Sequence, residues 1–344
     1  MTFADAPKGR DNNLSFIRFV ISLLVIYYHA FAVTGQGTTY SMLWSRETVS
    51  TSHIGLYMLF FYGGFLLMRS MEKKQKAGPY FRARCLRVFP SLWIVVLLCV
   101  LILGPLMTTC SLKDYFLDAR TPLYLLNGLL IPVHDLPGVF ESNPYLPTVN
   151  GSLWSLPVEF ICYALCYLFF RLNFSRTPRR TLLSVPLVLA GTALGSWVLA
   201  GQEVLLSAIP PALYFYLGML CYLFRDRIPK NRWLFVSLLA AAATTMRLGL
   251  LPYTGYFLLP YIFLFLAFGT EKTLSSFGGR HELSYQIYLL GWPVQQTLVA
   301  LFPGMSWAVN CLGTLAVCFP AALALEWAEK KLIARLEHGA SKKG

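Results

Sequence analysis

Few charged residues interrupt this chain of 344 amino acids, and their scarcity excludes an ordinary soluble fold. Asp, Glu, Lys and Arg together make up 13% of the sequence, whereas soluble domains carry about 25%. Hydrophobic residues reach 56%, and the mean hydropathy is +0.56. This composition predicts a polytopic integral membrane protein.

Motifs for metal binding, thiol redox chemistry and nucleic-acid recognition are also absent from the sequence. The eight cysteines show neither Cys-x-x-Cys pairs nor a Cys/His ligand spacing, so we expect small apolar side chains and no metal site. The net charge of +13 accompanies no recognition motif, and we expect no nucleic-acid partner. The polar residues 1–13 lack the apolar core of a signal peptide, so the first membrane span should be retained.

Ten apolar runs are long enough to cross a bilayer, which takes about 20 residues per helix. No internal repeat or long linker separates them. We therefore predict an all-α membrane domain over residues 14–328, with about ten transmembrane helices around a central cavity. A cytoplasmic segment, 1–13, precedes this domain, and a basic cytoplasmic tail, 329–344, follows it. The predicted spans are residues 15–34, 54–70, 88–107, 153–170, 182–200, 206–224, 233–249, 254–270, 283–302 and 307–327.

The basic residues predict the orientation of these spans. With a cytoplasmic N-terminus, 25 of the 29 Lys and Arg residues lie on the inner side, and those left outside are Arg46, Lys113, Arg120 and Arg247. Cytoplasmic loops are enriched in Lys and Arg, so both termini should be cytoplasmic. The longest loop, 108–152, then faces outward. Its apolar stretch, 121–133, is too short to span and should be re-entrant or interfacial.

Two ionisable side chains, Arg18 and His29, lie in the first apolar run. A charged group at the bilayer centre costs roughly 2.5–3.5 kcal/mol, so such residues indicate function. Eleven residues of helix return to within about 20° of the same face and rise by about 16 Å, which places both side chains in one groove at different depths. The alternatives are a structural interhelical hydrogen bond for His29 and snorkelling to the inner interface for Arg18.

Four sequence patterns occur in a characteristic order. In order and spacing they resemble the acyltransferase 3 family of membrane acyltransferases, and the resemblance runs from about residue 10 to 325. The patterns are Arg18 followed eleven residues later by His29, FFYGGFLL (60–67) with FRARCLRVFPSLW (81–93), NGSLWSLPVEFICY (150–163), and SYQIYLLGWPV (284–294).

The resemblance implies O-acylation across a bacterial inner membrane. Family members transfer acetyl or related groups from cytoplasmic acyl-CoA, a co-substrate and not a tightly bound cofactor, to hydroxyls of surface polysaccharides, lipopolysaccharide or other glycans, free or lipid-linked. The chain departs from the family pattern at Gly63, where Ser is common, and at Gly291, where His often precedes Trp-Pro. It also leaves no room for the soluble esterase-like domain of some members, so the membrane domain alone must supply catalysis.

The predicted catalytic residues are His29, Glu159 and Arg18. Acyl transfer to an alcohol needs a base, and a neutral imidazole is suited to that at neutral pH. Glu159 is expected at the depth of His29 and would orient the imidazole or grip the acceptor. A structural ion pair or snorkelling is the alternative for Glu159. Arg18, nearer the cytoplasm, would hold the pantetheine arm or polarise the thioester.

The donor and acceptor sites are predicted at opposite ends of the groove. Arg84 and Arg87 share one helical face and match phosphate geometry, so we assign them to CoA phosphates. Arg82, Lys73 and Lys74 would help them, although these cations could also serve only to set orientation. The acceptor side is assigned to Trp154, which could equally be an interfacial anchor, with Asn150 and Tyr285.

Two other classes of protein fit some of these features. A secondary transporter also carries intramembrane charges and a roofed cavity, but the sequence lacks broken-helix segments in two matching halves. A non-catalytic component of a glycan assembly or export complex would tolerate the loss of His29. Membrane lipids surround the protein in every case, and the sequence leaves homo-oligomerisation open.

Overall fold

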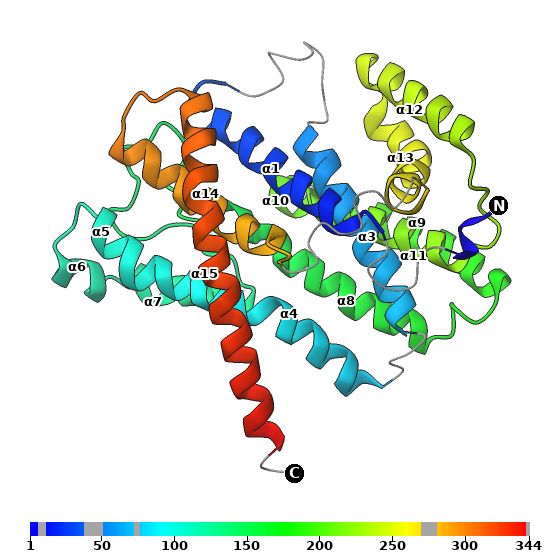
Figure 1. The fold of residues 1–344 in the computed structure, drawn as a ribbon, viewed down its shortest axis with the longest axis horizontal. Coiled ribbons are helices and arrows are strands. Elements are labelled where there is room, and N and C mark those ends of the chain that lie inside the picture. Colours follow the sequence, from blue (N-terminus) through cyan, green and yellow to red (C-terminus); the bar gives the residue numbers. More distant parts are fainter. Residues whose placement is uncertain (6–11, 38–50, 72–75, 270–280, 342–344) are drawn as a thin grey trace. The chain divides into compact units, whose positions relative to one another are not determined.

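The computed structural model describes residues 1–5, 12–37, 51–71, 76–269 and 281–341 (Figure 1). Within these ranges the regular structure is helical, apart from isolated β-bridges. A helix lies at each of the ten predicted places: α1 (Leu14–Val33), α3 (Thr51–Met71), α4 (Ala77–Leu98), α8 (Ser155–Arg171), α9 (Pro178–Val198), α11 (Ile209–Leu223), α12 (Arg232–Arg247), α13 (Leu251–Phe268), α14 (Ser284–Leu301) and α15 (Trp307–Ser341).

Seven helical segments of the described chain are long and apolar enough to cross a membrane. The all-α integral membrane architecture is therefore confirmed, while the number ten stays a prediction. Helices α11 and α12 have only 15 and 16 residues, and α14 carries three glutamines. The seven segments are Leu14–Val33, His53–Met71, Ala77–Met107, Gly151–Arg171, Pro178–Val198, Leu251–Phe268 and Trp307–Leu336.

Two helices extend beyond the predicted spans. Helix α4 begins at Ala77, about three turns before the predicted start at residue 88, and continues through a π-helical turn, Cys99–Leu103, into α5 (Gly104–Met107). The added turns hold Arg82, Arg84 and Arg87, which a search for apolar runs leaves out. Helix α15 likewise runs on to Ser341, past the end of the predicted membrane domain at residue 328.

The chain folds into two compact units. Unit 1 comprises Met1–Ile17, Trp44–Tyr80 and Val158–Phe277, and unit 2 comprises Arg18–Leu43, Phe81–Pro157 and Gly278–Gly344. Unit 1 holds α3, most of α8, and α9 to α13, including the short α10 (Glu203–Leu206). Unit 2 holds most of α1 and α4, the short elements between α4 and α8, and the pair α14 and α15.

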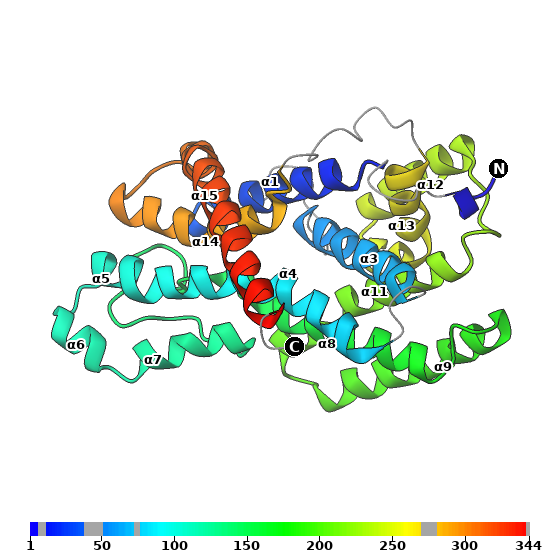
Figure 2. The same cartoon turned by 60° about the horizontal axis from the view of Figure 1, so that its bottom comes forward.

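The core of unit 1 is a close pairing of α3 and α11, which lie side by side in both ribbon views (Figures 1 and 2). A Cβ atom on Gly64 would lie 1.9 Å from the Phe215 carbonyl oxygen, and one on Gly218 would lie 2.0 Å from the Phe61 oxygen. Glycine at these crossing points lets the two backbones approach, as in other membrane helix pairs.

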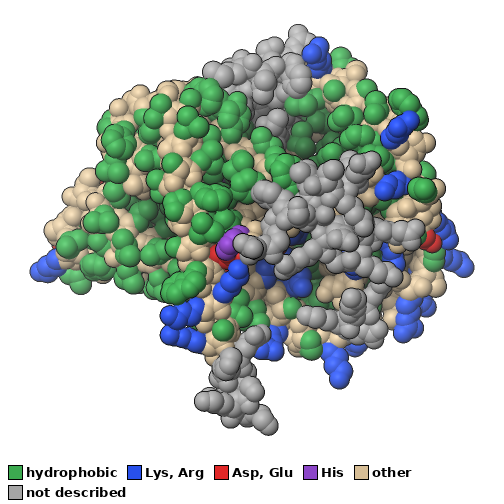
Figure 3. Space-filling view, in the orientation of Figure 1, with side chains coloured by type: hydrophobic (Ala, Val, Ile, Leu, Met, Phe, Trp, Pro, Cys, Tyr) green, Lys and Arg blue, Asp and Glu red, His purple; other side chains and the backbone are tan. Residues whose placement is uncertain are grey.

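Unit 2 is built around α14 and α15. The turn 302–306 joins the two helices, so they run antiparallel. Near this turn the Gln295 amide donates to the Asn310 Oδ1 atom at 3.2 Å, and the Asn310 amide donates to the Gln295 carbonyl at 3.1 Å. In Figure 3, hydrophobic side chains predominate over the upper part of α15, and Lys and Arg gather toward its C-terminal end.

The segment between α5 and α8 folds back against α4 through short helices, α6 (Leu112–Leu117), α7 (Arg120–Tyr124) and the 3-10 helix η3 (Leu125–Leu129). The Tyr115 hydroxyl donates to the Val100 carbonyl at 2.9 Å, and Gly128 lies directly against the Trp93 ring. The apolar stretch 121–133 therefore packs within unit 2 and does not form a further long helix.

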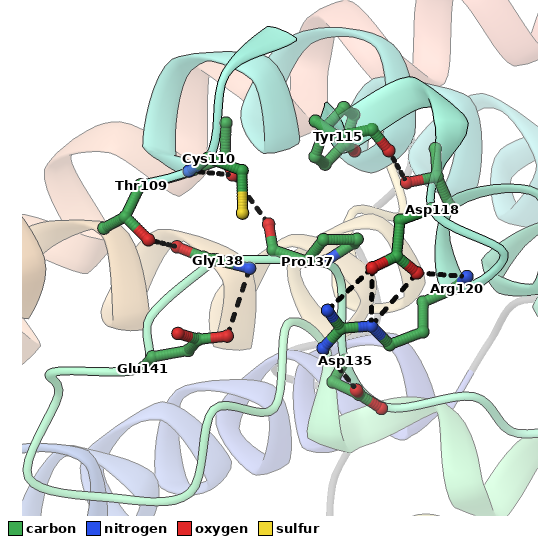
Figure 4. Close-up of polar contacts among 11 residues, drawn as sticks. Thr109, Cys110, Tyr115, Asp118, Arg120, Asp135, Pro137, Gly138 and Glu141 are labelled. Atoms are coloured by element: carbon green, nitrogen blue, oxygen red, sulfur yellow. Dashed lines mark hydrogen bonds and ion pairs between the residues drawn. The ribbon is translucent and has the colours of Figure 1, made fainter. Parts of the chain in front are cut away.

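Polar contacts also hold this segment together (Figure 4). The Arg120 guanidinium binds both carboxylate oxygens of Asp118, with the shortest distance at 2.8 Å, and these hydrogen bonds hold the pKa of the Asp118 carboxyl below its usual range. The Gly138 N–H donates to the Glu141 carboxylate at 3.1 Å. The predicted outer loop is thus an ordered structure that leads into η4 (Gly151–Trp154) and α8.

Candidate active site

His29 lies on the last turns of α1, half-buried, with its imidazole against the indole of Trp292 on α14. The ring centroids are 4.7 Å apart and the planes meet at 76°, an edge-to-face contact. The indole N–H donates to the Thr148 carbonyl at 2.9 Å, and the Tyr145 ring packs edge-on at 5.6 Å. Trp292 is therefore fixed on three sides, and it limits where the imidazole can turn.

The turn η4 supports the other face of Trp292. A Cβ atom on Gly151 would lie 2.8 Å from the indole ring, so only glycine lets the ring rest on this backbone. The neighbouring Asn150 side chain accepts from the Ser152 N–H at 3.2 Å and donates to the Leu289 carbonyl at 2.9 Å. With 1% of its surface exposed, Asn150 holds η4 against α14 through both groups of its amide.

Helix α14 also fixes the backbone of α1 near His29. The Gln295 amide donates to the Ile26 carbonyl at 2.8 Å, one turn before the imidazole. Gly291 packs against the Ile26 side chain, where a Cβ atom would lie 3.2 Å from Cγ1. The position at which the family often has His therefore faces α1 in unit 2.

Arg18 lies on the same uninterrupted helix as His29, eleven residues nearer its N-terminus. Its guanidinium forms an ion pair with Glu282 at 2.8 Å, and the two side chains are 13% and 47% exposed. Glu282 directly precedes Leu283, the residue at the N-terminal cap of α14. The salt bridge thus ties the beginning of α14 to α1, and Glu282 is a partner that the sequence did not predict.

The three predicted donor arginines lie on the first turns of α4. Arg84 is partly buried, while Arg82 and Arg87 are exposed. One turn beyond Arg84, the Val88 carbonyl accepts a hydrogen bond from Tyr285 at 3.0 Å. Tyr285 therefore lies beside the arginine-bearing end of α4. Lys73 and Lys74 lie outside the described residues.

A partly buried carboxylate joins three helices close to this end of α4. Glu329 on α15 accepts from the Ser91 hydroxyl at 2.7 Å and from the Gln286 amide at 2.6 Å. Tyr288 lies on the same face of α14 as Tyr285. Its hydroxyl donates to the Ser152 carbonyl at 2.5 Å and contacts the Ser155 hydroxyl at 2.7 Å. One face of α14 is thus hydrogen-bonded to α4, α15 and η4.

The comparisons with known proteins match the sequence of this chain to one family. Residues 11–327 match the acyltransferase 3 family, described as an acyltransferase domain. The chain belongs to this family of acyltransferases. An O-acetyl transferase of Shigella phage Sf6 is 24% identical over 345 residues, covering 95% of this chain and 97% of its own. Nodulation protein 10 of Rhizobium leguminosarum bv. viciae is 26% identical over 356 residues, covering 93% and 92%. No solved structure matches the chain.

The remaining two predicted residues of the acyltransferase lie in neighbouring elements. Trp154 ends η4 in unit 2 and is half-buried. Glu159 lies in the part of α8 that belongs to unit 1, where its carboxylate accepts a hydrogen bond from the Tyr163 hydroxyl. Its pairing with His29 stays a prediction. Among the described residues, no group of three His, Cys, Asp or Glu side chains could hold a metal ion.

Sequence reasoning missed the residues that position the acyltransferase's candidate base. Trp292, Gln295 and Tyr288 all lie in or just after the SYQIYLLGWPV pattern, which yielded only Tyr285. Their spacing of three and four residues was a usable signal, because it places them on one helical face. Glu282 and Glu329 gave no such signal, since their partners are distant in the sequence.

Proposed function

We propose that this acyltransferase moves an acyl group, acetyl in the first place, from cytoplasmic acyl-CoA to a hydroxyl of a glycan. The half-buried imidazole of His29, held by Trp292 on the helix that also carries Arg18, is the observation that supports this most strongly. The relative described as an O-acetyl transferase supports acetyl as the group transferred. The proposal includes about ten spans around a central cavity, with both termini in the cytoplasm of a cell whose inner membrane holds the protein.

In the proposed reaction His29 is the general base. Its neutral imidazole takes the proton of the acceptor hydroxyl as the hydroxyl oxygen attacks the thioester carbonyl carbon. The tetrahedral intermediate then collapses, the C–S bond breaks, and the imidazolium returns the proton to the departing CoA sulfur. The products are the glycan ester and free CoA, and His29 is regenerated.

Arg18 and the α4 arginines would bind the donor. Arg84 and Arg87 would hold the CoA phosphates, with Arg82 beside them, because guanidinium groups pair with phosphate oxygens in a bidentate manner. Arg18 would contact the pantetheine arm or thioester. Its ion pair with Glu282 holds the guanidinium beside the beginning of α14.

Glu159 and Trp154 would serve the acceptor. The hydrogen bond from Tyr163 keeps the Glu159 carboxylate in one orientation, from which it could receive a sugar hydroxyl or the imidazole N–H. Trp154 offers a flat face for a sugar ring. Asn150 contributes by holding η4, the turn that carries Trp154.

Substitution of His29 tests the reaction. A strain that lacks the protein would be complemented with wild type, His29→Ala or His134→Ala, and the O-acyl content of its surface glycans measured by mass spectrometry. We expect His29→Ala to lose transfer by about 10²- to 10⁴-fold, the usual contribution of a general base. His134, an exposed histidine of the 108–150 segment, is the matched control and should retain activity. Unchanged acylation in His29→Ala at equal membrane abundance would favour a non-catalytic component.

A further inference from the structure

Unit 1 contains a cavity lined by both polar and apolar side chains, and none of them belongs to the candidate active site. Its volume is about 430 Å³, within the range of about 300–1,000 Å³ for small-molecule sites. Three apolar side chains from different helices form one wall, Met68 of α3, Phe170 of α8 and Leu223 of α11. The polar part of the lining comes from Arg171, the last residue of α8, and from Asn173, Ser175 and Arg176 in the connection to α9.

The connection between α8 and α9 has a fixed shape. Asn173 adopts a left-handed conformation with φ of 62°, which turns the chain after the end of α8. The N–H of Phe174 donates to the Phe169 carbonyl at 3.2 Å, and the Phe174 carbonyl accepts from the Thr181 hydroxyl at 2.8 Å. This turn brings Arg171 and Arg176 to one cavity although they are five residues apart.

Both guanidinium groups are available to a ligand. Across the ranges that the structure describes, neither Arg171 nor Arg176 forms a side-chain hydrogen bond or ion pair, and the Ser175 hydroxyl also lacks a hydrogen-bond partner. The two guanidinium groups can only donate hydrogen bonds, and the Ser175 hydroxyl can donate one as well. No carboxylate lines the cavity and competes with a ligand for these donors. An oxyanion with several acceptor oxygens satisfies such a set.

We propose that this cavity binds a phosphate ester. Arg171, Arg176 and Ser175 would hold the phosphate oxygens, because planar guanidinium groups match phosphate in a bidentate manner. The apolar side chains of Met68, Phe170 and Leu223 would cover the organic part of the ligand. Inorganic phosphate has no organic part to contact them, so the lining favours a phosphate ester. An anionic phospholipid of the surrounding leaflet and a nucleotide phosphate share this chemistry.

Binding of two phosphate esters to the purified full-length protein distinguishes the sources. In a maltoside detergent, which contains no phosphate, native mass spectrometry would measure the binding of phosphatidic acid and of adenosine 3′,5′-bisphosphate to the protein. Diacylglycerol and adenosine, which lack the phosphate groups, are the control ligands. The test variant is Arg171→Ala/Arg176→Ala. Its matched control is Arg179→Ala/Arg180→Ala, which removes the same charge from exposed positions that do not line the cavity.

We expect at least one phosphate ester to bind wild type and the control variant, and the lining variant to bind about 100-fold more weakly, about tenfold per guanidinium. Phosphatidic acid alone would identify a lipid headgroup, and the bisphosphate alone a nucleotide. The proposal fails if neither ester binds wild type, if the lining variant binds each ester as tightly as wild type, as it would if the bisphosphate occupied only the proposed CoA site, if both variants weaken binding equally, or if diacylglycerol or adenosine binds as tightly as its phosphate. Matching unfolding temperatures of the two variants would show that both are folded.

Discussion

At the scale of single residues, Trp292 decides how His29 is presented. The indole contacts the imidazole on one side and is fixed by the Thr148 carbonyl, the Tyr145 ring and the Gly151 backbone on others. We propose that Trp292 acts through His29 and not on the substrate, as a positioning residue. Displacing a catalytic group by about 1 Å can cost about 10²-fold in rate.

We therefore expect Trp292→Phe to lower kcat roughly 10- to 100-fold while the KM for acyl-CoA stays near that of wild type. Phenylalanine loses the hydrogen bond to the Thr148 carbonyl, so the ring that contacts the imidazole is no longer held in one position. Gly151→Ala should act in the same way, since its methyl group displaces the indole. Steady-state kinetics in proteoliposomes would measure both parameters. Trp197→Phe, at an exposed tryptophan of α9, is the control, and an equal loss there would contradict the positioning role.

Sequence reasoning reached part of this residue-level picture. The spacing of Arg18 and His29 placed both on one face of one helix, because helical periodicity is local information. The partners Glu282, Trp292 and Glu329 are distant in sequence from the residues they contact, so only the fold brings them together. Asn150 shows the converse: its position in a family pattern predicted a substrate contact, and the structure engages its amide in holding η4.

At the scale of elements, the donor assignment rests on the first turns of α4. Arg84→Ala and Arg87→Ala should raise the KM for acetyl-CoA with little change in acceptor preference, because these residues are proposed to bind phosphates far from the reacting carbon. Each lost charge-assisted hydrogen bond costs roughly 1.5–3 kcal/mol. Titration with acetyl-CoA and with dephospho-acetyl-CoA on wild type and variants would measure the effect. If the ratio of the KM values for the two donors is the same in wild type and both variants, the arginines only set the orientation of the protein in the membrane.

The pairing of α3 and α11 predicts a large effect of one methyl group. Gly218→Ala puts a Cβ atom 2.0 Å from the Phe61 carbonyl oxygen, so the helices must separate. Overpacking of this kind costs about 1–3 kcal/mol, and the temperature of unfolding in detergent should fall by several degrees. Gly195→Ala on α9 is the control, since its Cβ atom meets nothing within 4 Å. An equal unfolding temperature for both variants would contradict the close pairing.

Most elements could be predicted from the sequence, because long apolar runs and Pro or polar interruptions are local features. Their ends were less accurate. Helix α4 begins at Ala77 because arginine is a good helix former, although it lowers the hydropathy used to find the span. Helix α15 continues past residue 328 because Glu, Lys, Leu, Ala and Arg, the good helix formers, make up most of the sequence there. The short helices between 112 and 129 are defined by contacts such as Tyr115 to Val100, which no local pattern encodes.

At the scale of the whole molecule, the exposed Cys110 reports the predicted orientation. It lies in the segment assigned to the outer side, while the other cysteines are buried or partly buried. A membrane-impermeant maleimide should modify wild type in right-side-out vesicles, and Cys110→Ser should remove the modification. The labelling would be detected by gel shift. Labelling only after permeabilisation would show that the orientation is the opposite of the predicted one, and the donor site would then face the outside.

The hydrogen bond from Gln295 to the Ile26 carbonyl has a consequence for biosynthesis. Helix α1 leaves the ribosome before α14, and the residues that fix its backbone and the imidazole of His29 are translated about 270 positions later. Asn310, which holds Gln295 in place, comes later still. We therefore expect a nascent chain that stops before α14 to carry every candidate catalytic residue and yet be inert, and newly made protein to gain activity only when α14 and α15 have inserted.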